Sequence, residues 1–273
     1  MPSLTVPRPR LVIAAAAIAA GALCVLAAAP PASAQSAARY VALGDSYSSG
    51  LGAGSYIGSS GSCDRSTSAY SQLWANANAP ASYVSVACAG ATTSSVVSSQ
   101  LSALSSATTL VSITVGGNDV GFSSTMETCV LSSTSSCVSA VNADEAAIAS
   151  SLPGEMNNVL GAIRSAAPAA RVVVLDYPEL YDLSRSSGCI GLSTTDRTAL
   201  NGAADQLDAA IQAAAQRFGD TFVDVRPSFA GHEICDSSSW LHSVNILNID
   251  ESYHPTAAGQ ASGYYPAFSA AAG

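Results

Sequence analysis

The 273-residue chain contains no lysine and has few charged residues of any kind. Charged side chains make up 11% of the sequence, and its ten basic residues, all arginine, face 19 acidic ones, a formal net charge of -9. A chain with this balance repels the phosphate backbone of DNA and RNA, so nucleic acid is not an expected partner. Aromatic residues are also scarce, at 6%, and the three histidines all lie beyond residue 231.

Long apolar runs are missing except at the N-terminus. Two arginines precede an apolar run over residues 11–29, and the small-residue sequence Ala-Ser-Ala follows at 32–34. This order is typical of a secretory signal peptide, so we expect residues 1–34 to be removed and residues 35–273 to form one domain. The run is long enough for a membrane anchor, but the cleavage pattern favours export without a stable anchor. The sequence therefore predicts a secreted, extracellular protein.

Six of the seven cysteines lie beyond this leader, and none are spaced as CxxC. An even number of cysteines in an exported chain indicates disulfide bonds rather than a thiolate metal site, so no metal is expected. Six cysteines allow several connectivities, and pairing of sequence neighbours favours three short-range bridges. These are Cys63–Cys88, Cys129–Cys137 and Cys189–Cys235.

Short β-branched segments alternate with helical patterns along the chain. The predicted strands are residues 40–44, 83–87, 110–116, 171–176 and 221–225, and the clearest helices are 154–167 and 194–218. Such alternation predicts a mostly parallel sheet covered by helices on both faces. Ligands of such sheets bind at the carboxyl ends of the strands.

Three consecutive strand ends carry groups that could act together. Ser46 follows the first strand in GDSYSSG, Gly90 follows the second in CAGAT, and Asn118 follows the third in VGGNDVGF. Each stretch taken alone reads equally well as a turn. Together they would place a hydroxyl, a backbone N–H and an amide at one edge of the sheet.

A general base for Ser46 has to come from the three histidines. His254 lies in a polar turn, DESYHPTAAGQ, before the expected C-terminal helix, whereas His242 has no such setting. His232 lies in GHEIC, close to the HExxH pattern of zinc proteases, but Asp236 stands where the second histidine should be. We therefore interpret His232 as structural and His254 as the candidate base.

These blocks resemble the SGNH (GDSL-type) hydrolase superfamily. GDSYSSG matches its first block, Gly90 its second, GGND its third and His254 with the following proline its last, in family order from residue 44 to 255. The six cysteines and the stretch FAGHEIC further resemble the secreted actinobacterial lipases and esterases of that superfamily. The resemblance implies an α/β fold, a three-layer α/β/α sandwich around a five-stranded parallel sheet. It also implies a carboxylic ester hydrolase that uses no cofactor.

By this resemblance Ser46 is the nucleophile and His254 is the general base. The oxyanion hole would consist of the N–H groups of Ser46 and Gly90 and the side chain of Asn118. Residues of these types at these positions suit acyl transfer through a covalent acyl-enzyme.

The acid of the family motif is the one departure. An aspartate normally stands three residues before the histidine, and this chain has Glu251 there, with Asp250 one residue earlier. Glu251 could orient the imidazole, or a main-chain carbonyl of Glu251 or Ser252 could do so in a Ser-His dyad. Both arrangements stay open at this point. Asp176, at another strand end, is interpreted as a turn residue.

Other readings of the sequence explain fewer of its features. The α/β-hydrolase elbow, G-x-S-x-G, needs glycine where Ser48 stands, and GLGAG lacks the third glycine of a dinucleotide site because Ser55 takes its place. A non-catalytic secreted binding protein on the same fold would have lost part of the Ser46, Gly90, Asn118 and His254 set. We therefore expect an enzyme, and a monomer since no interface pattern is evident.

The sequence predicts a broad class of substrates. Acyl esters of lipids, either glycerides or phospholipids, are expected, with a phospholipase A-type activity or a carbohydrate acetyl esterase as alternatives. A phosphate head group would have to be recognised by isolated cations such as Arg65 or Arg185. Apolar residues near the site could accept an acyl chain, namely Tyr47, Leu51, Tyr56, Val120 and Phe122.

Overall fold

Five parallel strands form the sheet of this protein in a computed structural model that describes residues 1–4, 38–185, 189 and 191–273. The strands run in the order β2-β1-β3-β4-β5, and every neighbouring pair is parallel. The predicted leader lies, apart from its first four residues, outside the described residues. The strand bounds are β1 Arg39–Gly44, β2 Ser82–Ser85, β3 Leu110–Thr114, β4 Arg171–Leu175 and β5 Thr221–Val223.

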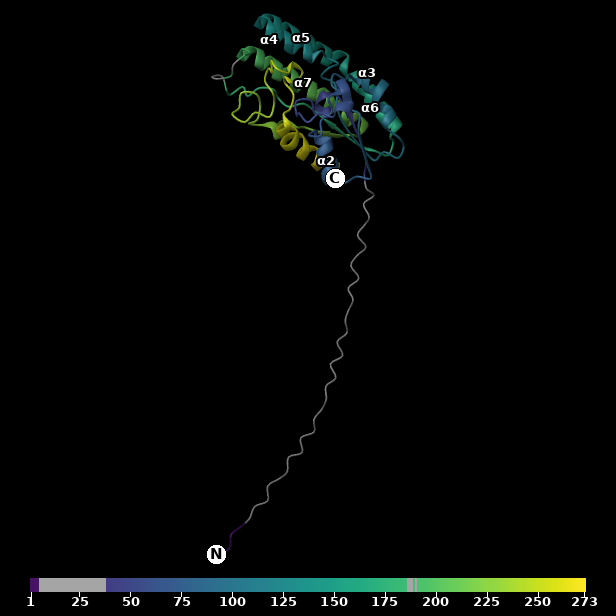
Figure 1. Cartoon of the computed structure of the whole chain (residues 1–273), viewed down its shortest axis with the longest axis vertical. Coiled ribbons are helices and arrows are strands. Elements are labelled where there is room, and N and C mark those ends of the chain that lie inside the picture. Colours follow the sequence, from purple (N-terminus) through teal and green to yellow (C-terminus); the bar gives the residue numbers. More distant parts are fainter. Residues whose placement is uncertain (5–37, 186–188, 190) are drawn as a thin grey trace. The chain divides into compact units, whose positions relative to one another are not determined.

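Helices cover both faces of the sheet and make a three-layer α/β/α sandwich (Figure 1). Helices α2 and α9 pack on one face, while α3, α6 and α7 lie on the other, with α4 and α5 beyond them. The α-helices are α1 Ser46–Ser49, α2 Tyr70–Asn78, α3 Thr93–Ser95, α4 Phe122–Leu131, α5 Thr134–Ser150, α6 Leu152–Ala166, α7 Thr194–Phe218, α8 Arg226–Phe229 and α9 Tyr265–Ala272. Shorter 3₁₀ and π segments are Gly58–Cys63, Val96–Gln100, Leu101–Ala103, Ile249–Glu251 and Gly259–Tyr264.

The sequence explains the central elements directly. All five residues of β3 are buried, as are the last four of β4, because helices cover the strands from both sides and β-branched side chains pack well there. Helix α7 begins at a capping box formed by Ser193 and Asp196 and ends at Gly219, which has the left-handed φ of 67°. The predicted helix over 194–218 therefore has the bounds that its caps dictate.

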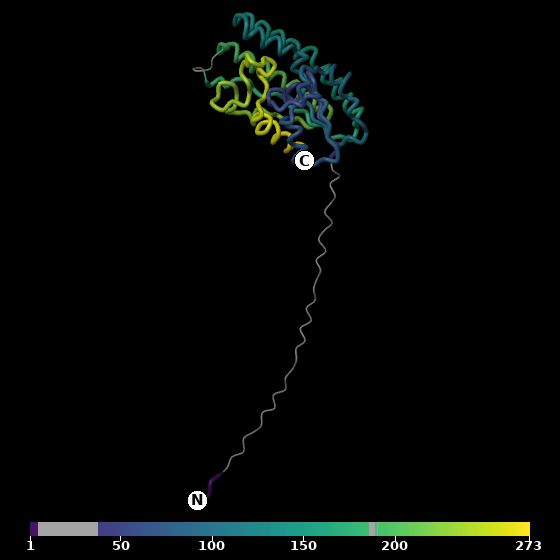
Figure 2. Tube along the Cα trace, in the orientation of Figure 1, coloured from purple at the N-terminus to yellow at the C-terminus, as the bar shows by residue number. Residues whose placement is uncertain are grey.

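The end of the chain returns to the first strand. Phe268 of α9 stacks on Tyr40 of β1 with ring centroids 5.4 Å apart and meets Trp74 of α2 edge to face at 5.8 Å. Figure 2 shows this C-terminal segment, in yellow, beside the blue segment that contains α2. Aromatic pairs of this geometry add to the area that they bury. The packing brings the segment that contains His254 back toward β1.

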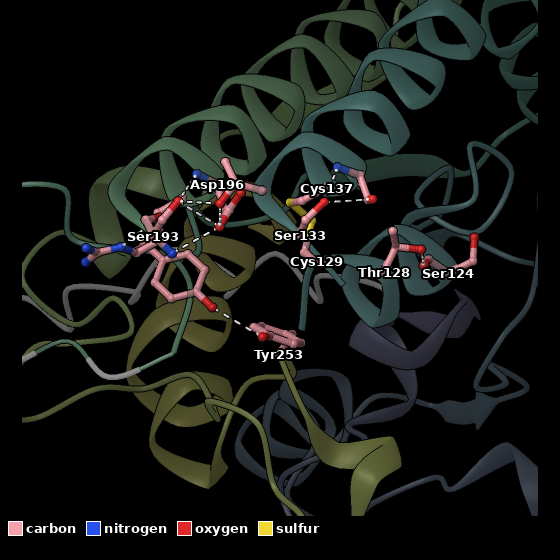
Figure 3. The surroundings of a disulfide bond; sticks show 12 residues. Ser124, Thr128, Cys129, Ser133, Cys137, Ser193, Asp196 and Tyr253 are labelled. Carbon is pink, nitrogen blue, oxygen red and sulfur yellow. Dashed lines mark hydrogen bonds between the residues drawn. A yellow bond between two sulfur atoms is a disulfide. The ribbon is translucent and has the colours of Figure 1, made fainter. Parts of the chain in front are cut away.

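Three disulfide bonds join loops and helix ends. Cys63 is bonded to Cys88, Cys129 to Cys137, and Cys189 to Cys235. The first links the long loop after β1 to the loop after β2. The second joins α4 to α5, and Figure 3 shows it at the junction of the two helices. Each bond restricts the unfolded chain more than the folded one.

The sheet has a switch point between β1 and β3. The chain leaves β1 toward β2 on one side and later returns to add β3 on the other, so the loops after these strands diverge. Gly44 ends β1 with a φ of 117°, and a Cβ there would lie 2.3 Å from the carbonyl oxygen of Thr114. Only glycine permits this close approach of the two strand ends. The residues after β1 and β3 therefore meet at one crevice.

Asp176, interpreted from the sequence as a turn residue, follows β4. It is fully buried after β4, and its Oδ1 accepts a hydrogen bond from the N–H of Val225 at 2.8 Å. Burial raises the pKa of Asp176 to about 7.

Within the described ranges, no helix combines the length and the hydropathy needed to cross a bilayer.

Candidate active site

Ser46 begins a four-residue helix directly after β1. Asp45 caps this helix, since its Oδ1 accepts from the N–H of Tyr47 at 3.0 Å. The same carboxylate accepts from the hydroxyl of Thr114 at 2.6 Å and from the hydroxyl of Tyr177. Asp45 thus fixes the turn that presents Ser46 to β3 and to the loop after β4.

Two further polar side chains hold this turn from below. Gln100 pairs with the backbone of Gly44, accepting from its N–H and donating to its carbonyl, both at 2.8 Å. The hydroxyl of Ser48 accepts from the N–H of Thr114 at 3.0 Å and contacts the hydroxyl of Tyr70 at 3.1 Å. Because these groups are buried and satisfied, the turn before Ser46 has one arrangement.

His254 is held on a short antiparallel pairing. The N–H of His242 donates to the carbonyl of His254, and the N–H of Tyr253 donates to the carbonyl of His242, both at 3.0 Å. Tyr47 donates its hydroxyl to the carbonyl of Tyr253 at 2.7 Å, which ties this segment to the turn of Ser46. Gly52 allows the approach, since a Cβ there would lie 3.0 Å from the Cβ of His254.

The two segments bring the imidazole of His254 to Ser46. Nε2 of His254 lies 2.7 Å from Oγ of Ser46, and Nδ1 lies 3.0 Å from the carbonyl oxygen of Ser252. A carbonyl oxygen only accepts, so Nδ1 carries the proton and Nε2 is left to accept from the Ser46 hydroxyl. This is the tautomer that a general base for Ser46 needs.

Glu251 does not reach the imidazole. Its Oε1 accepts from the hydroxyl of Tyr56 at 2.6 Å, and its Oε2 accepts from the side chain of Asn245 at 3.2 Å. In the described chain, no carboxylate oxygen lies within 4.0 Å of a ring nitrogen of His254. Of the two arrangements left open by the sequence, the geometry has the main-chain carbonyl of Ser252 facing Nδ1.

Burial shifts the titration of both central groups. Desolvation in the cleft lowers the pKa of His254 to about 4, although the bond to the Ser252 carbonyl favours the charged ring. Desolvation also raises the pKa of Asp45 to about 6, against the hydrogen bonds from Thr114 and Tyr177. His254 is therefore neutral over the pH range in which a base must accept a proton.

Three groups near Ser46 can donate to a developing oxyanion. The N–H of Ser46 is at the start of α1 and has no partner within the helix. Gly90, with a φ of 75°, lies in a turn in which Ala91 donates to the carbonyl of Cys88 at 3.1 Å, and among the described residues its own N–H meets no backbone acceptor. Asn118 donates one amide hydrogen to the carbonyl of Ala91 at 3.0 Å and keeps a second.

These groups line one cleft of about 640 Å³. Ser46, Gly90, Asn118 and His254 all belong to its wall. Of the apolar residues expected to accept an acyl chain, Tyr47, Leu51 and Phe122 line the cleft, but Val120 and Tyr56 do not. Val120 is buried in the core, and Tyr56 holds Glu251. Besides Leu51, the aliphatic part of the wall is supplied by residues that the sequence did not single out for the site, Met126, Val130, Leu131, Leu180, Leu207, Val244 and Ile249.

The two candidate cations for a phosphate group lie elsewhere. Arg65 donates to the carbonyl of Ala87 at 3.2 Å, and Arg185 pairs with Asp182 and Asp236. The described lining of the cleft contains acidic side chains and no arginine. The cleft is therefore suited to the apolar and neutral parts of a substrate.

His232 has a structural role. Its ring stacks on Trp240 with centroids 3.6 Å apart, and its Nδ1 lies 2.8 Å from the carbonyl oxygen of Ser238. Within the described part of the chain, no three histidine, cysteine, aspartate or glutamate side chains gather as metal ligands would.

Sequence reasoning missed the residues that support the turn of Ser46. Gln100 lies in a serine-rich segment whose pattern indicates only a polar loop or helix face, so its contact with Gly44 has no local signal. Tyr177 and Thr114 follow or end their strands, as the expected site residues do, but a tyrosine or threonine there is ordinary in a sheet. The one signal in the sequence is Asp45 itself, an acidic residue in GDS directly after an apolar strand, where its carboxylate accepts from three groups.

Comparisons with known proteins agree with this geometry. The chain matches the GDSL-like Lipase/Acylhydrolase family over residues 42–261. It is 55% identical over 262 residues to Lipase 1 of Streptomyces coelicolor, covering 96% of both chains. Among solved structures it is similar to phospholipase A1 from Streptomyces albidoflavus NA297 (51% identity) and to an extracellular lipase from Streptomyces rimosus (49% identity). Each of the two structures superposes on this chain with a TM-score of 0.84. Each alignment covers 86% of this chain and 100% of the solved chain.

The lowered pKa of His254 can be measured directly. Burial disfavours the imidazolium, so we expect the ring to take up its proton only near pH 4, below the range of about 6.5 for a free histidine. A proton NMR titration of the three histidine rings measures this, and a His254→Asn variant identifies the resonance. A titration midpoint of His254 at or above pH 6.5 would show that the ring is not desolvated in the cleft.

Proposed function

Since the chain belongs to the GDSL-like lipase/acylhydrolase family and is a carboxylic ester hydrolase of the lipase or esterase type, we propose that Ser46 is its nucleophile and that acyl esters of lipids are its substrates. The observation that carries the proposal is the 2.7 Å contact between Oγ of Ser46 and Nε2 of His254 inside the cleft. A nucleophile within hydrogen-bond reach of a base, itself oriented by a third group, is the arrangement of an activated serine.

The reaction starts with proton transfer from the Ser46 hydroxyl to Nε2 of His254. Oγ then bonds to the ester carbonyl carbon, and the carbonyl oxygen becomes the oxyanion of a tetrahedral intermediate. When this intermediate collapses, the ester C–O bond breaks and the leaving alcohol takes the proton from Nε2. Water, deprotonated by the same nitrogen, then bonds to the acyl carbon; the bond from that carbon to Oγ breaks, the carboxylic acid leaves, and Oγ takes the proton back from Nε2, which restores Ser46.

The oxyanion is stabilised by the N–H groups of Ser46 and Gly90 and by the second amide hydrogen of Asn118. These donors are fixed before the reaction, because the bond from Asn118 to Ala91 orients the amide and the Cys63–Cys88 bond holds the turn of Gly90. Donors that need no reorganisation stabilise the transition state more than the ground state.

The imidazole is oriented by the Ser252 carbonyl in a Ser-His dyad. The carbonyl oxygen accepts the Nδ1 proton at 3.0 Å and disperses part of the positive charge that forms on the ring. Glu251 acts at one remove, since its bonds to Tyr56 and Asn245 fix the segment that contains Ser252. Glu251 is therefore a positioning residue rather than the acid of a triad.

The substrate is an acyl lipid, either a glyceride or a phospholipid. The wall of the cleft carries aliphatic and aromatic side chains, which suit an acyl chain. Phospholipid is supported as a second substrate by the 51% identity to a phospholipase A1, although the described residues of the cleft wall include no arginine for the phosphate. The similarity to an extracellular lipase and the three disulfide bonds support secretion, and we expect a monomer.

The nucleophile is tested by covalent labelling. A nitrophenyl alkylphosphonate should release nitrophenol and leave one phosphonyl group on Oγ of Ser46, which peptide mass spectrometry locates. Ser46→Ala should take no label and lose at least about 10⁴ in kcat on a nitrophenyl ester. An active Ser46→Ala protein, or a label on another residue, would show that a different group attacks the ester.

The oxyanion hole is tested by removing its amide. Asn118→Ala should lower kcat by about 10²–10³ and change KM little, because the lost bond forms mainly in the transition state. Ser123→Ala, another residue of the cleft wall, is the matched control and should keep its rate. Equal rates for the two variants, with unchanged circular dichroism, would remove Asn118 from the mechanism.

The dyad is tested at Glu251. Glu251→Gln keeps an oxygen that can accept from Tyr56, so we expect kcat to fall less than about tenfold. The acid of a triad would instead cost about 10⁴ on amide substitution. Steady-state kinetics on a soluble ester, with His254→Ala as the inactive reference, decides between the two. A loss of several orders of magnitude in Glu251→Gln would restore the triad.

A further inference from the structure

We propose that the mouth of the cleft is a docking surface for aggregated lipid without net charge. The surface is formed by four exposed aliphatic residues, Leu131, Ile246, Leu247 and Ile249, called here the aliphatic rim. This inference rests on the proposed function, since it describes how the same site meets its substrate in bulk. It assigns a role to side chains that the hydrolytic mechanism does not use.

The rim is unusually exposed for aliphatic side chains. Leu247 is 94% exposed, Ile246 86%, Leu131 74% and Ile249 63%. Leu131 and Ile249 also line the cleft, so the apolar wall of the cleft continues onto the outer surface. Ile246 and Leu247 lie in the turn between Val244 and Ile249, which both line the cleft. Exposed aliphatic side chains that adjoin a site indicate contact with another apolar phase.

Ile246 and Leu247 project from an ordered turn. Oδ1 of Asn245 accepts from the N–H groups of Leu247 and Asn248, both at 3.2 Å, and the N–H of Asn245 donates to the hydroxyl of Ser252 at 2.9 Å. The turn is thus closed by the residue whose carbonyl faces His254. The two exposed side chains have a fixed support that is continuous with the catalytic segment.

Leu131 has a separate support at the end of α4. It is the last residue of α4, two residues after Cys129, which is bonded to Cys137 of α5. Figure 3 shows this bond beside the start of α7, where Thr134 donates its hydroxyl to Oδ2 of Asp196 at 3.2 Å. The end of α4 is therefore bonded to α5, which is in turn hydrogen-bonded to the start of α7. A rim on fixed supports can insert without first ordering itself.

Charge decides which lipid surface fits. The cleft wall contains Asp64, Glu127 and Asp250 and, among the described residues, no arginine. The whole chain has a formal net charge of -9 and no lysine. Binding to anionic lipid normally uses basic side chains on the docking face, and repulsion acts here instead. Burial of the rim in a zwitterionic surface, such as phosphatidylcholine, meets no such opposition.

The docking surface is tested by a double variant, Ile246→Ser/Leu247→Ser. Neither residue lines the cleft, so kcat/KM on a monomeric short-chain nitrophenyl ester should stay within about twofold of the wild type. Hydrolysis of phosphatidylcholine vesicles or of a triglyceride emulsion should fall at least about tenfold, through a higher apparent KM. The matched control, Val84→Ser/Leu183→Ser, removes two exposed aliphatic side chains that are outside the cleft wall and should change neither rate.

Binding is measured apart from hydrolysis with Ser46→Ala. This protein should co-sediment with phosphatidylcholine vesicles, more weakly with vesicles that contain phosphatidylglycerol, and at least about tenfold more weakly once Ile246 and Leu247 are replaced. Equal sedimentation with and without the double substitution overturns the inference, and so does stronger binding to the anionic vesicles. A concentration-dependent dimer that the double substitution abolishes would also overturn it, because the rim would then bind a second copy.

The two proposals fail differently. If the wild type does not cleave the soluble ester, the proposed function is wrong, whatever the vesicles show. If it cleaves the soluble ester and the double variant cleaves vesicles equally well, the docking surface alone is wrong.

Discussion

The hydrogen bond between Ser46 and His254 joins residues that are 208 positions apart in the sequence. Its length is set by backbone geometry rather than by the two side chains alone. Gly44 lets β1 end against β3, and Gly52 lets the segment of His254 approach the loop after α1. The hydroxyl of Tyr47 then ties the turn of Ser46 to the segment of His254. Without these close approaches, Oγ of Ser46 and Nε2 of His254 would not lie within hydrogen-bond distance of each other.

Beneath this pair, Asp45 organises the crevice. One carboxylate caps α1, accepts from Thr114 at the end of β3 and accepts from Tyr177 after β4. Its burial is costly, and the raised pKa of about 6 records that cost. The hydrogen bonds that offset it come from three different strand ends, so the carboxylate holds these ends in one relation. The charged carboxylate of Asp45 thus lies where the segments after β1, β3 and β4 meet.

The sequence predicted the architecture well, because the sheet is determined by local patterns. Buried β-branched runs define the strands, and the capping box before α7 defines its start. Family order placed Ser46, Gly90, Asn118 and His254 at one edge, and the structure brings all four to one cleft. The sequence left the partner of Nδ1 open between Glu251 and a main-chain carbonyl, since a main-chain acceptor leaves no residue pattern. Gln100 and the aliphatic rim were missed because their roles depend on what lies opposite in space.

The carbonyl of Ser252 has a consequence for how the site tolerates change. A main-chain oxygen has no side chain, so no simple exchange of one amino acid for another deletes it. Nor does it titrate, so acid that would neutralise a carboxylate partner leaves the ring oriented. The side chain of Glu251 is instead engaged with Tyr56 and Asn245, so it secures the loop rather than the ring.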